Sequence, residues 1–168
     1  MDQLVAGLRR RFAALQDRFE AFRSHGVQVE GWFKGELIAH LHSSGRAFDR
    51  EVRFGSRRVD FILPRDASRD ACEIKSWLIG TQKGERWTAR KYFCDQSSVG
   101  IVPDLRKLPD WKYGRRFLLI FCYDNPGPED WEEGLRKFRE KFPEFRLEGR
   151  TRPQEDPTSW YAGVIELV

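Results

Sequence analysis

The sequence predicts an α/β protein in which a mixed β-sheet is flanked by helices. Three observations support this class. Amphipathic helical patterns stand near both ends of the chain, and three short alternating segments follow one another in its first half. The most apolar stretch, residues 115–123, is short enough to be a fully buried strand. Helices and strands that follow each other in this way are typical of a sheet covered by helices.

Two helices are expected at the start of the chain. Residues 2–24 carry apolar side chains at three- and four-residue spacing, with charged residues largely between them. A second apolar stripe runs through "GWFKGELIAHLHSS", residues 31–44, and Gly45 follows it as a helix-ending residue. Glu36 lies near the edge of this second stripe, so the helix can present it to a neighbouring element.

Three strands are expected next, at residues 48–54, 57–63 and 71–77. The two residues "GS" between the first pair are short enough for a tight hairpin. A polar turn that starts at Pro64 joins the second pair. The group therefore predicts an antiparallel meander.

The second half of the chain predicts a helical region, a strand, a helix and a last strand. Residues 80–112 are expected to form a loop that leads into short helical pieces punctuated by prolines. The remaining elements are the buried strand 115–123, a helix from Pro128 to about Phe142 and a final strand 160–168. We expect one domain over residues 1–168, consisting of an N-terminal helix (1–24), a core (31–123) and a C-terminal helix and strand (124–168).

Composition is typical of a globular protein. Hydrophobic residues make up 40% of the 168 residues and charged residues 33%, a balance that argues against disorder. No run of about 18 apolar residues is present, and the N-terminal residues do not resemble a signal peptide, so we expect no membrane partner and a cytoplasmic location. Cys72, Cys94 and Cys122 are too widely spaced to suggest zinc ligands, and three buried, reduced thiols are expected.

Three charged residues on neighbouring strands are the candidates for chemistry. Glu73 and Lys75 are two residues apart in one strand, so their side chains point to the same face. If the strand before it pairs through the intervening turn, Asp60 projects near Glu73. Two carboxylates this close repel each other unless a cation lies between them. Lys75 supplies one positive charge, whereas a divalent ion such as Mg²⁺ or Mn²⁺ supplies two and prefers oxygen ligands.

A divalent ion in this position would polarise a phosphodiester and make a bound water more acidic. Its expected ligands are Asp60, Glu73 and the backbone carbonyl of Ile74, with Glu36 as a further acid from the preceding helix. Lys75 would position or deprotonate the water and offset charge on the phosphate. The alternative is a cross-strand salt bridge on a solvated sheet face, which contributes only about 0.2–1 kcal/mol.

This arrangement resembles the PD-(D/E)XK nucleases, the restriction-endonuclease-like superfamily. Their signature is an acid on one strand and, about a dozen residues later, Glu-x-Lys on the next strand. Here the signature is "RRVD" with Asp60 and "CEIK" with Glu73 and Lys75. A preceding helix that bears an acid, here Glu36, and the order helix, meander, helix, strand are also common in the family. The resemblance covers roughly residues 31–123.

The resemblance implies a restriction-endonuclease-like fold and a Mg²⁺-dependent nuclease, with DNA as the expected substrate. The segment "DLRKL", residues 104–108, is similar to one found in uncharacterised members. Two features depart from the pattern: Val59 stands where a proline often precedes the first acid, and no QxxxY motif follows Lys75. A catalytically silent scaffold that binds nucleic acid or a protein partner is the alternative. A homodimer is compatible with cutting both strands of a duplex.

A basic segment follows the Glu-x-Lys strand and is the expected nucleic-acid contact. Residues 83–116 hold nine Lys and Arg against four Asp and Glu. The candidate contacts are Gln82, Lys83, Arg86, Arg90 and Lys91. Four aromatic residues in or near the segment could stack on bases or serve the core: Trp77, Trp87, Tyr92 and Trp111.

A third interpretation is that the chain is an interaction protein with an acidic face near its C-terminus. Residues 124–160 hold ten Asp and Glu against seven Lys and Arg. An acidic face there would suit a basic protein partner. The acids that would form it are Glu129, Asp130, Glu132 and Glu133.

Overall fold

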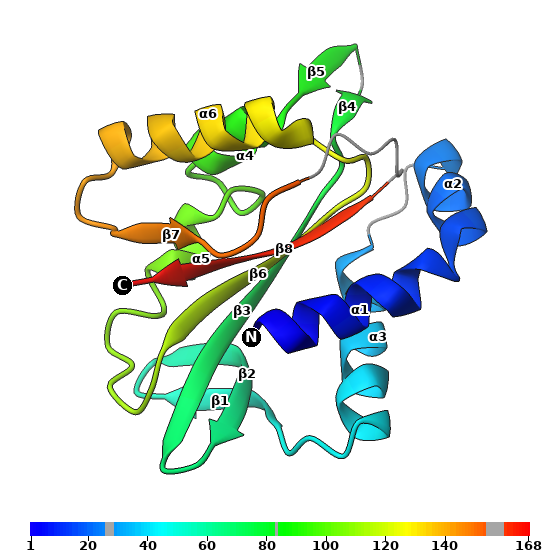
Figure 1. Cartoon of the computed structure of the whole chain (residues 1–168). Coiled ribbons are helices and arrows are strands. Elements are labelled where there is room, and N and C mark those ends of the chain that lie inside the picture. Colours follow the sequence, from blue (N-terminus) through cyan, green and yellow to red (C-terminus); the bar gives the residue numbers. More distant parts are fainter. Residues whose placement is uncertain (26–28, 83, 154–159) are drawn as a thin grey trace.

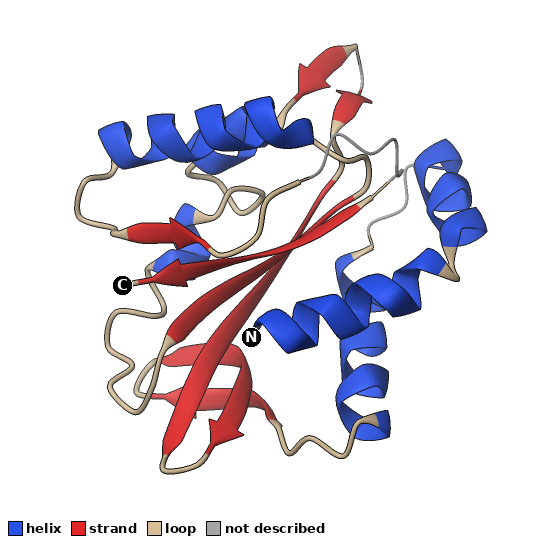
Figure 2. Cartoon of the chain, viewed as in Figure 1, coloured by secondary structure: helices blue, strands red, loops and turns tan. Residues whose placement is uncertain are grey.

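A computed structural model describes residues 1–25, 29–82, 84–153 and 160–168. The fold is built on a mixed six-stranded sheet with helices on both faces, as Figures 1 and 2 show. The strands are β1 (Asp49–Phe54), β2 (Arg57–Arg65), β3 (Ser68–Trp77), β6 (Arg116–Cys122), β7 (Leu147–Gly149) and β8 (Tyr161–Leu167). Their order across the sheet is β1-β2-β3-β6-β8-β7. The predicted α/β class is confirmed at this level.

The helices divide between the two faces of the sheet (Figure 1). On one face lie α1 (Asp2–Ala13), α2 (Gln16–His25) and α3 (Glu30–Ser43). On the other lie α4 (Ala89–Cys94), α5 (Val102–Leu105) and α6 (Gly127–Lys141). A separate hairpin of β4 (Gly80–Gln82) and β5 (Glu85–Trp87) extends beyond the end of the sheet.

Strand β6 is the centre of the molecule. It pairs with β3 in parallel and with β8 in antiparallel orientation. Because side chains alternate along a strand, Phe117, Leu119 and Phe121 enter the core beneath α1–α3, while Leu118 and Ile120 enter the core beneath α4–α6. The prediction that this apolar stretch is a strand buried on both faces is confirmed.

The predicted single helix over residues 2–24 is wrong, since the structure divides it into α1 and α2. Both Phe12 of α1 and Phe19 of α2 contact the ring of Phe121, at centroid distances of 5.2 and 5.3 Å. On one straight helix these two residues would lie about 10 Å apart along the axis. The break after Ala13 therefore allows both rings to reach the same partner.

The meander is confirmed, but its second turn is shorter than predicted. Strand β2 continues through Pro64 to Arg65, and β3 begins at Ser68, so Asp66 and Ala67 alone separate the two strands. Asp66 adopts the left-handed conformation with φ +50°, which aspartate tolerates better than most residues.

Two features were not foreseen: the β4–β5 hairpin, which the sequence predicted as loop, and the three-residue strand β7. Both are too short to show an apolar alternation. The three cysteines are free thiols, as expected; Cys72 and Cys122 are buried and Cys94 is half-buried. No helix in the described part of the chain is long and apolar enough to cross a membrane.

Candidate active site

Strand β3 presents Glu73 and Lys75 to one face of the sheet, as predicted. Ala71 and Trp77 belong to the core beneath α4–α6, whereas Ile74 belongs to the core beneath α1–α3. Glu73 and Lys75 share the alternation phase of Ala71 and Trp77, so they lie on the α4–α6 side. Both are buried, and Glu73 has no solvent-exposed surface.

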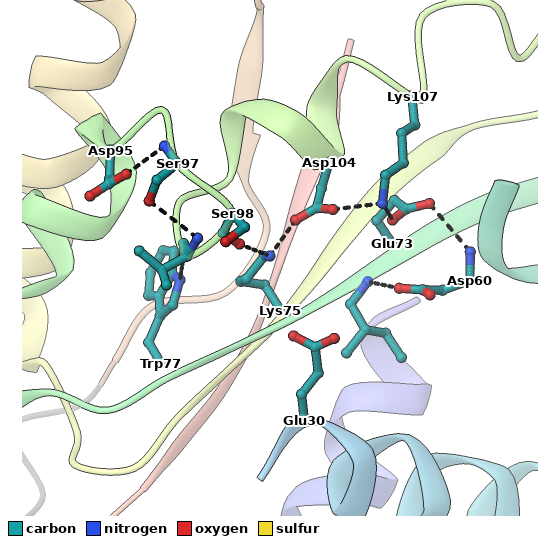
Figure 3. Close-up of polar contacts among 12 residues, drawn as sticks. Glu30, Asp60, Glu73, Lys75, Trp77, Asp95, Ser97, Ser98, Asp104 and Lys107 are labelled. Carbon is teal, nitrogen blue, oxygen red and sulfur yellow. Dashed lines mark hydrogen bonds and ion pairs between the residues drawn. The ribbon is translucent and has the colours of Figure 1, made fainter. Parts of the chain in front are cut away.

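Asp60 and Glu73 meet between strands β2 and β3. The ladder between these strands ends at the pair Phe61–Cys72. Beyond this pair the backbone N–H of Asp60 donates to Glu73 Oε1 (3.3 Å), and the backbone N–H of Ile74 donates to Asp60 Oδ2 (3.0 Å; Figure 3). The Asp60 carboxylate thus accepts the Ile74 hydrogen bond that a carbonyl of β2 would accept in a regular ladder, and the Glu73 carboxylate binds the Asp60 backbone, so the backbone pairing of the two strands stops at these acids.

An irregularity in β2 accompanies this arrangement. Val59 and Ile62 are three residues apart, yet both lie in the core beneath α4–α6, so the strict alternation of a strand is broken between them. Across from Asp60, Glu51 of β1 has φ +53°, a rare backbone conformation for glutamate. This local distortion, of the kind found at β-bulges, turns Asp60 into the gap between β2 and β3.

Each carboxylate of the pair is neutralised by a lysine from another part of the chain. Lys34 of α3 donates to Asp60 Oδ1 at 2.9 Å and also lies 3.2 Å from Glu30. Lys107, which follows α5, donates to Glu73 Oε2 at 2.7 Å. The two acids are therefore anchored by cations that come from opposite faces of the sheet.

The charged residues at this point of the sheet form one cluster: Glu30, Lys34, Asp60, Glu73, Lys75, Asp104 and Lys107. Within it, Asp104 of α5 links Lys75 and Lys107. Its Oδ1 accepts a hydrogen bond from Lys107 Nζ at 2.7 Å. Its Oδ2 lies 2.6 Å from Lys75 Nζ, an ion pair without hydrogen-bond alignment. Lys75 also donates to the backbone carbonyl of Ser98 at 2.9 Å. Figure 3 shows the resulting row of contacts from Ser98 through Lys75, Asp104 and Lys107 to Glu73.

The environment changes the pKa values of several of these groups. Burial raises the pKa of Glu73 to about 7; the charges of Asp60 and Asp104 add to this rise, and the hydrogen bond from Lys107 opposes it. Burial alone would lower the pKa of Lys107, but its bonds to Asp104 and Glu73 outweigh burial and raise it. The pKa of Lys34 is raised in the same way, because the hydrogen bond and charge of Asp60 outweigh its burial. Both lysines are thus cationic at neutral pH.

The structure does not bring Glu36 to the carboxylate pair, which corrects the sequence prediction. Its carboxylate forms an ion pair with Arg11 of α1 at 2.5 Å. Lys34, two residues earlier on the same helix, is the residue that points to Asp60, and two residues correspond to about 200° around a helix. Glu30, which shares Lys34 with Asp60, is instead the acid that α3 brings to this cluster.

The oxygen atoms between β2 and β3 fit a hard divalent ion that keeps part of its water shell. No group of three or more His, Cys, Asp and Glu side chains suited to a metal occurs within residues 1–25, 29–82, 84–153 and 160–168. Two carboxylates are nevertheless enough for Mg²⁺, which usually retains several waters. The N–H of Ile74 points to Asp60, and the carbonyl of an extended residue points to the same edge as its N–H. Asp60, Glu73 and the Ile74 carbonyl could therefore hold the ion.

Three of the five predicted nucleic-acid contacts lie together. A hollow of about 540 Å³ between β5, α4 and α6 is lined by Arg86, Thr88, Arg90, Lys91, Cys94, Asp95 and Lys137. Four of these seven residues are cations and one is an acid, which suits a polyanion. The segment 95–100 leads from this hollow to Ser98, the partner of Lys75. Lys83 and the side chain of Gln82 lie outside the described part of the chain.

The aromatic residues near the basic segment mostly serve the core. Trp77, Tyr92 and Trp111 are buried, and the rings of Trp77 and Tyr92 stack at 5.1 Å. Base stacking is therefore excluded for these three in this conformation. Trp87 is half-buried, and the ammonium of Lys91 lies 3.9 Å from its ring centroid.

The acids at the start of α6 are largely engaged within the chain. Asp130 accepts a hydrogen bond from the backbone N–H of Ala89 at 2.6 Å and so caps α4. Glu132 pairs with Arg152, and Glu133 pairs with Arg136. These contacts remove much of the support for an acidic docking face.

Sequence reasoning gave no role to four charged residues of the cluster, although it noted the segment 104–108 that contains two of them: Glu30, Lys34, Asp104 and Lys107. A signal was present, because each acid stands one helical turn before its lysine. Comparisons of the chain with known protein families, with curated proteins and with solved structures gave no match. The geometry of the site therefore carries the functional argument.

Proposed function

We propose that this chain is a nuclease of the PD-(D/E)XK kind that uses Mg²⁺ or Mn²⁺ to hydrolyse phosphodiester bonds in DNA. The observation that carries the proposal is that the Asp60 and Glu73 carboxylates each accept a backbone N–H of the facing strand between β2 and β3, with Lys75 on the same face as Glu73. Apart from the inserted β4–β5 hairpin, the element order α3, β1–β2–β3, α4–α5 and β6 is the order that the resemblance implies. A restriction-endonuclease-like fold is part of this proposal.

The residues of the cluster have distinct tasks in such a reaction. A bound divalent ion would supply Lewis acidity for the phosphodiester and for water. Asp60 and Glu73 would hold it with the Ile74 carbonyl. Lys75, one residue further along β3, would place a positive charge beside the phosphate as negative charge builds up in the transition state. Lys75 is buried, and a charge acts more strongly in a buried site than in bulk water.

The basic hollow supports a nucleic-acid substrate. Arg86, Arg90 and Lys91 line it, and cations of this kind bind backbone phosphates without reading sequence. They would hold the strand while the scissile phosphate occupies the gap between β2 and β3. This division of roles predicts that substitution of Arg90 weakens DNA binding and makes it less salt-dependent, without affecting metal binding.

The test is cleavage of circular and linear DNA, single- and double-stranded, and of RNA, in Mg²⁺, in Mn²⁺ and in EDTA. Wild type is compared with Asp60→Asn and Lys75→Ala, and with Glu133→Gln on α6 as a control for removal of a half-buried charge that pairs with Arg136. Asparagine can still accept the hydrogen bond from Ile74, so Asp60→Asn should fold. We expect metal-dependent cleavage that falls at least about 100-fold in both site variants. Absence of metal-dependent cleavage on every substrate contradicts the proposal.

A second candidate is a catalytically silent scaffold that binds nucleic acid. It is favoured by one observation: Lys34 and Lys107 already neutralise Asp60 and Glu73. On this interpretation the acids and lysines form a permanent buried network with no role for a metal. DNA binding would then be unchanged by EDTA and would survive Asp60→Asn.

A further inference from the structure

Lys107 occupies an unusual position in the cluster. Its ammonium lies 2.7 Å from Glu73 Oε2 and 2.7 Å from Asp104 Oδ1. Glu73 is fully buried and Asp104 is nearly so, whereas 36% of the Lys107 side chain is exposed. A partly exposed lysine thus supplies the positive charge for two carboxylates that have little contact with water.

The cluster needs this charge as long as no other cation is present. Buried carboxylates that lie near one another are costly unless a cation compensates them. Lys34 performs the equivalent task for Asp60, at 2.9 Å, and shares its charge with Glu30. Both carboxylates proposed as metal ligands are therefore satisfied by lysines.

A divalent ion would compete with Lys107 for the Glu73 carboxylate. Glu73 Oε1 already accepts from the backbone N–H of Asp60, and Oε2 accepts from Lys107. An ion held by Asp60 and Glu73 would sit close to the Lys107 ammonium, and like charges at short distance repel strongly where water is scarce. Lys107 can move aside at low cost, since its stem is partly exposed and Asp104 remains as its partner.

We propose that Lys107 is a displaceable counter-cation: it neutralises Glu73 in the metal-free protein, leaves Glu73 for Asp104 when a divalent ion binds, and thereby limits the affinity of the site for that ion. This inference rests on the proposed metal-dependent function. It assigns Lys107 a role in controlling metal occupancy, separate from the role beside the phosphate that the proposed function gives to Lys75.

The expected magnitude follows from the contact that the metal must break. The ion must break a hydrogen bond between charged partners, which is stronger than a neutral one, but the partial exposure of Lys107 weakens it. Removing the lysine should therefore tighten ion binding by about tenfold. Lys107→Met keeps the length of the apolar stem and removes the charge. Lys107→Gln is a second variant that retains a donor for Glu73.

The experiment is titration of Mn²⁺ into the metal-free protein. Binding is measured from the electron paramagnetic resonance signal of free Mn²⁺ and, separately, by calorimetry. Wild type is compared with Lys107→Met, Lys107→Gln, Lys107→Arg and Asp60→Asn. Lys137→Met is the matched control: it removes a similarly exposed lysine, 41% accessible, that pairs with Glu133 on α6. The same samples are unfolded thermally with and without Mn²⁺, because an ion that binds only the folded state raises Tm.

We expect Lys107→Met and Lys107→Gln to bind Mn²⁺ about tenfold more tightly than wild type and to gain more in Tm when it is added. Lys107→Arg and Lys137→Met should bind as wild type does, and Asp60→Asn should not bind. If wild type binds Mn²⁺ at Asp60 but Lys107→Met binds no better than Lys137→Met, this inference is overturned and the proposed function stands. If Mn²⁺ binds to none of the proteins, the metal-dependent function fails and the inference fails with it.

Discussion

Replacement of Glu73 by glutamine should change how the stability of the metal-free protein depends on pH. Burial, with the charges of Asp60 and Asp104, raises the pKa of Glu73 to about 7 in the folded state, against an ordinary value of 4.5. Between these two values the folded protein keeps a proton that the unfolded chain has already released. The contribution of Glu73 to stability is therefore greatest at low pH and is lost as the pH rises from 4.5 to about 7.

The size of this effect follows from the pKa change. One pKa unit corresponds to roughly 1.4 kcal/mol, so the complete loss is about 3 kcal/mol. Glutamine does not titrate and shows no such loss. The difference in unfolding free energy, Glu73→Gln minus wild type, should therefore rise by roughly 2–3 kcal/mol between pH 5 and pH 8.5.

Urea unfolding in EDTA at the two pH values measures this difference. The control is Glu133→Gln, because hydrogen bonding to Arg136 lowers the pKa of Glu133 and its substitution should not produce a shift of the same sign. If the free-energy difference between Glu73→Gln and wild type is the same at both pH values, Glu73 does not hold its proton to high pH. Such a result would refute a Glu73 pKa raised by burial.

Three further substitutions test the packing by urea unfolding at one pH. Gly134→Ala should lower the unfolding free energy by about 1–3 kcal/mol, because a Cβ would lie 2.5 Å from Phe93 and 3.0 Å from the Cα of Arg90, where α6 approaches α4. Unchanged stability would mean that these helices lie further apart. Gly35→Ala on α3 should raise the unfolding free energy by roughly 0.5–1 kcal/mol, since nothing lies within 4 Å of the added Cβ and alanine favours helix. A lower unfolding free energy would show that the Cβ meets a contact at this position. Phe121→Ala should cost about 3–5 kcal/mol, because its buried ring is central to the core beneath α1–α3; a cost below about 1 kcal/mol would contradict that packing.

The sequence predicted those features that depend on local periodicity. Alternation and short turns located β1, β2 and β3, and an uninterrupted apolar run located β6. The same period of two placed Glu73 and Lys75 on one face. The approach of Asp60 to Glu73 followed from the pairing of the two strands, and the register agrees with it.

Other features depend on contacts between distant segments. Asp104 and Lys107 reach β3 from about 30 residues further along the chain, and Lys34 reaches Asp60 from α3. Glu36 was misplaced because an acid at the edge of an apolar stripe can face either of two neighbours, and α1 provides Arg11. The break between α1 and α2 was missed for a similar reason, since the apolar spacing is the same with or without it.

The assignment of Asp60 and Glu73 as a metal-dependent active site is tested by one comparison. Wild type and Asp60→Asn are assayed for the rate at which they cut supercoiled plasmid and circular single-stranded DNA in Mg²⁺ and in EDTA. The proposed function predicts cleavage of at least one substrate by wild type in Mg²⁺, none in EDTA, and a loss of at least about 100-fold in the variant. Equal rates for the two proteins, or cleavage that persists in EDTA, would contradict the assignment of Asp60 and Glu73 as a metal-dependent active site.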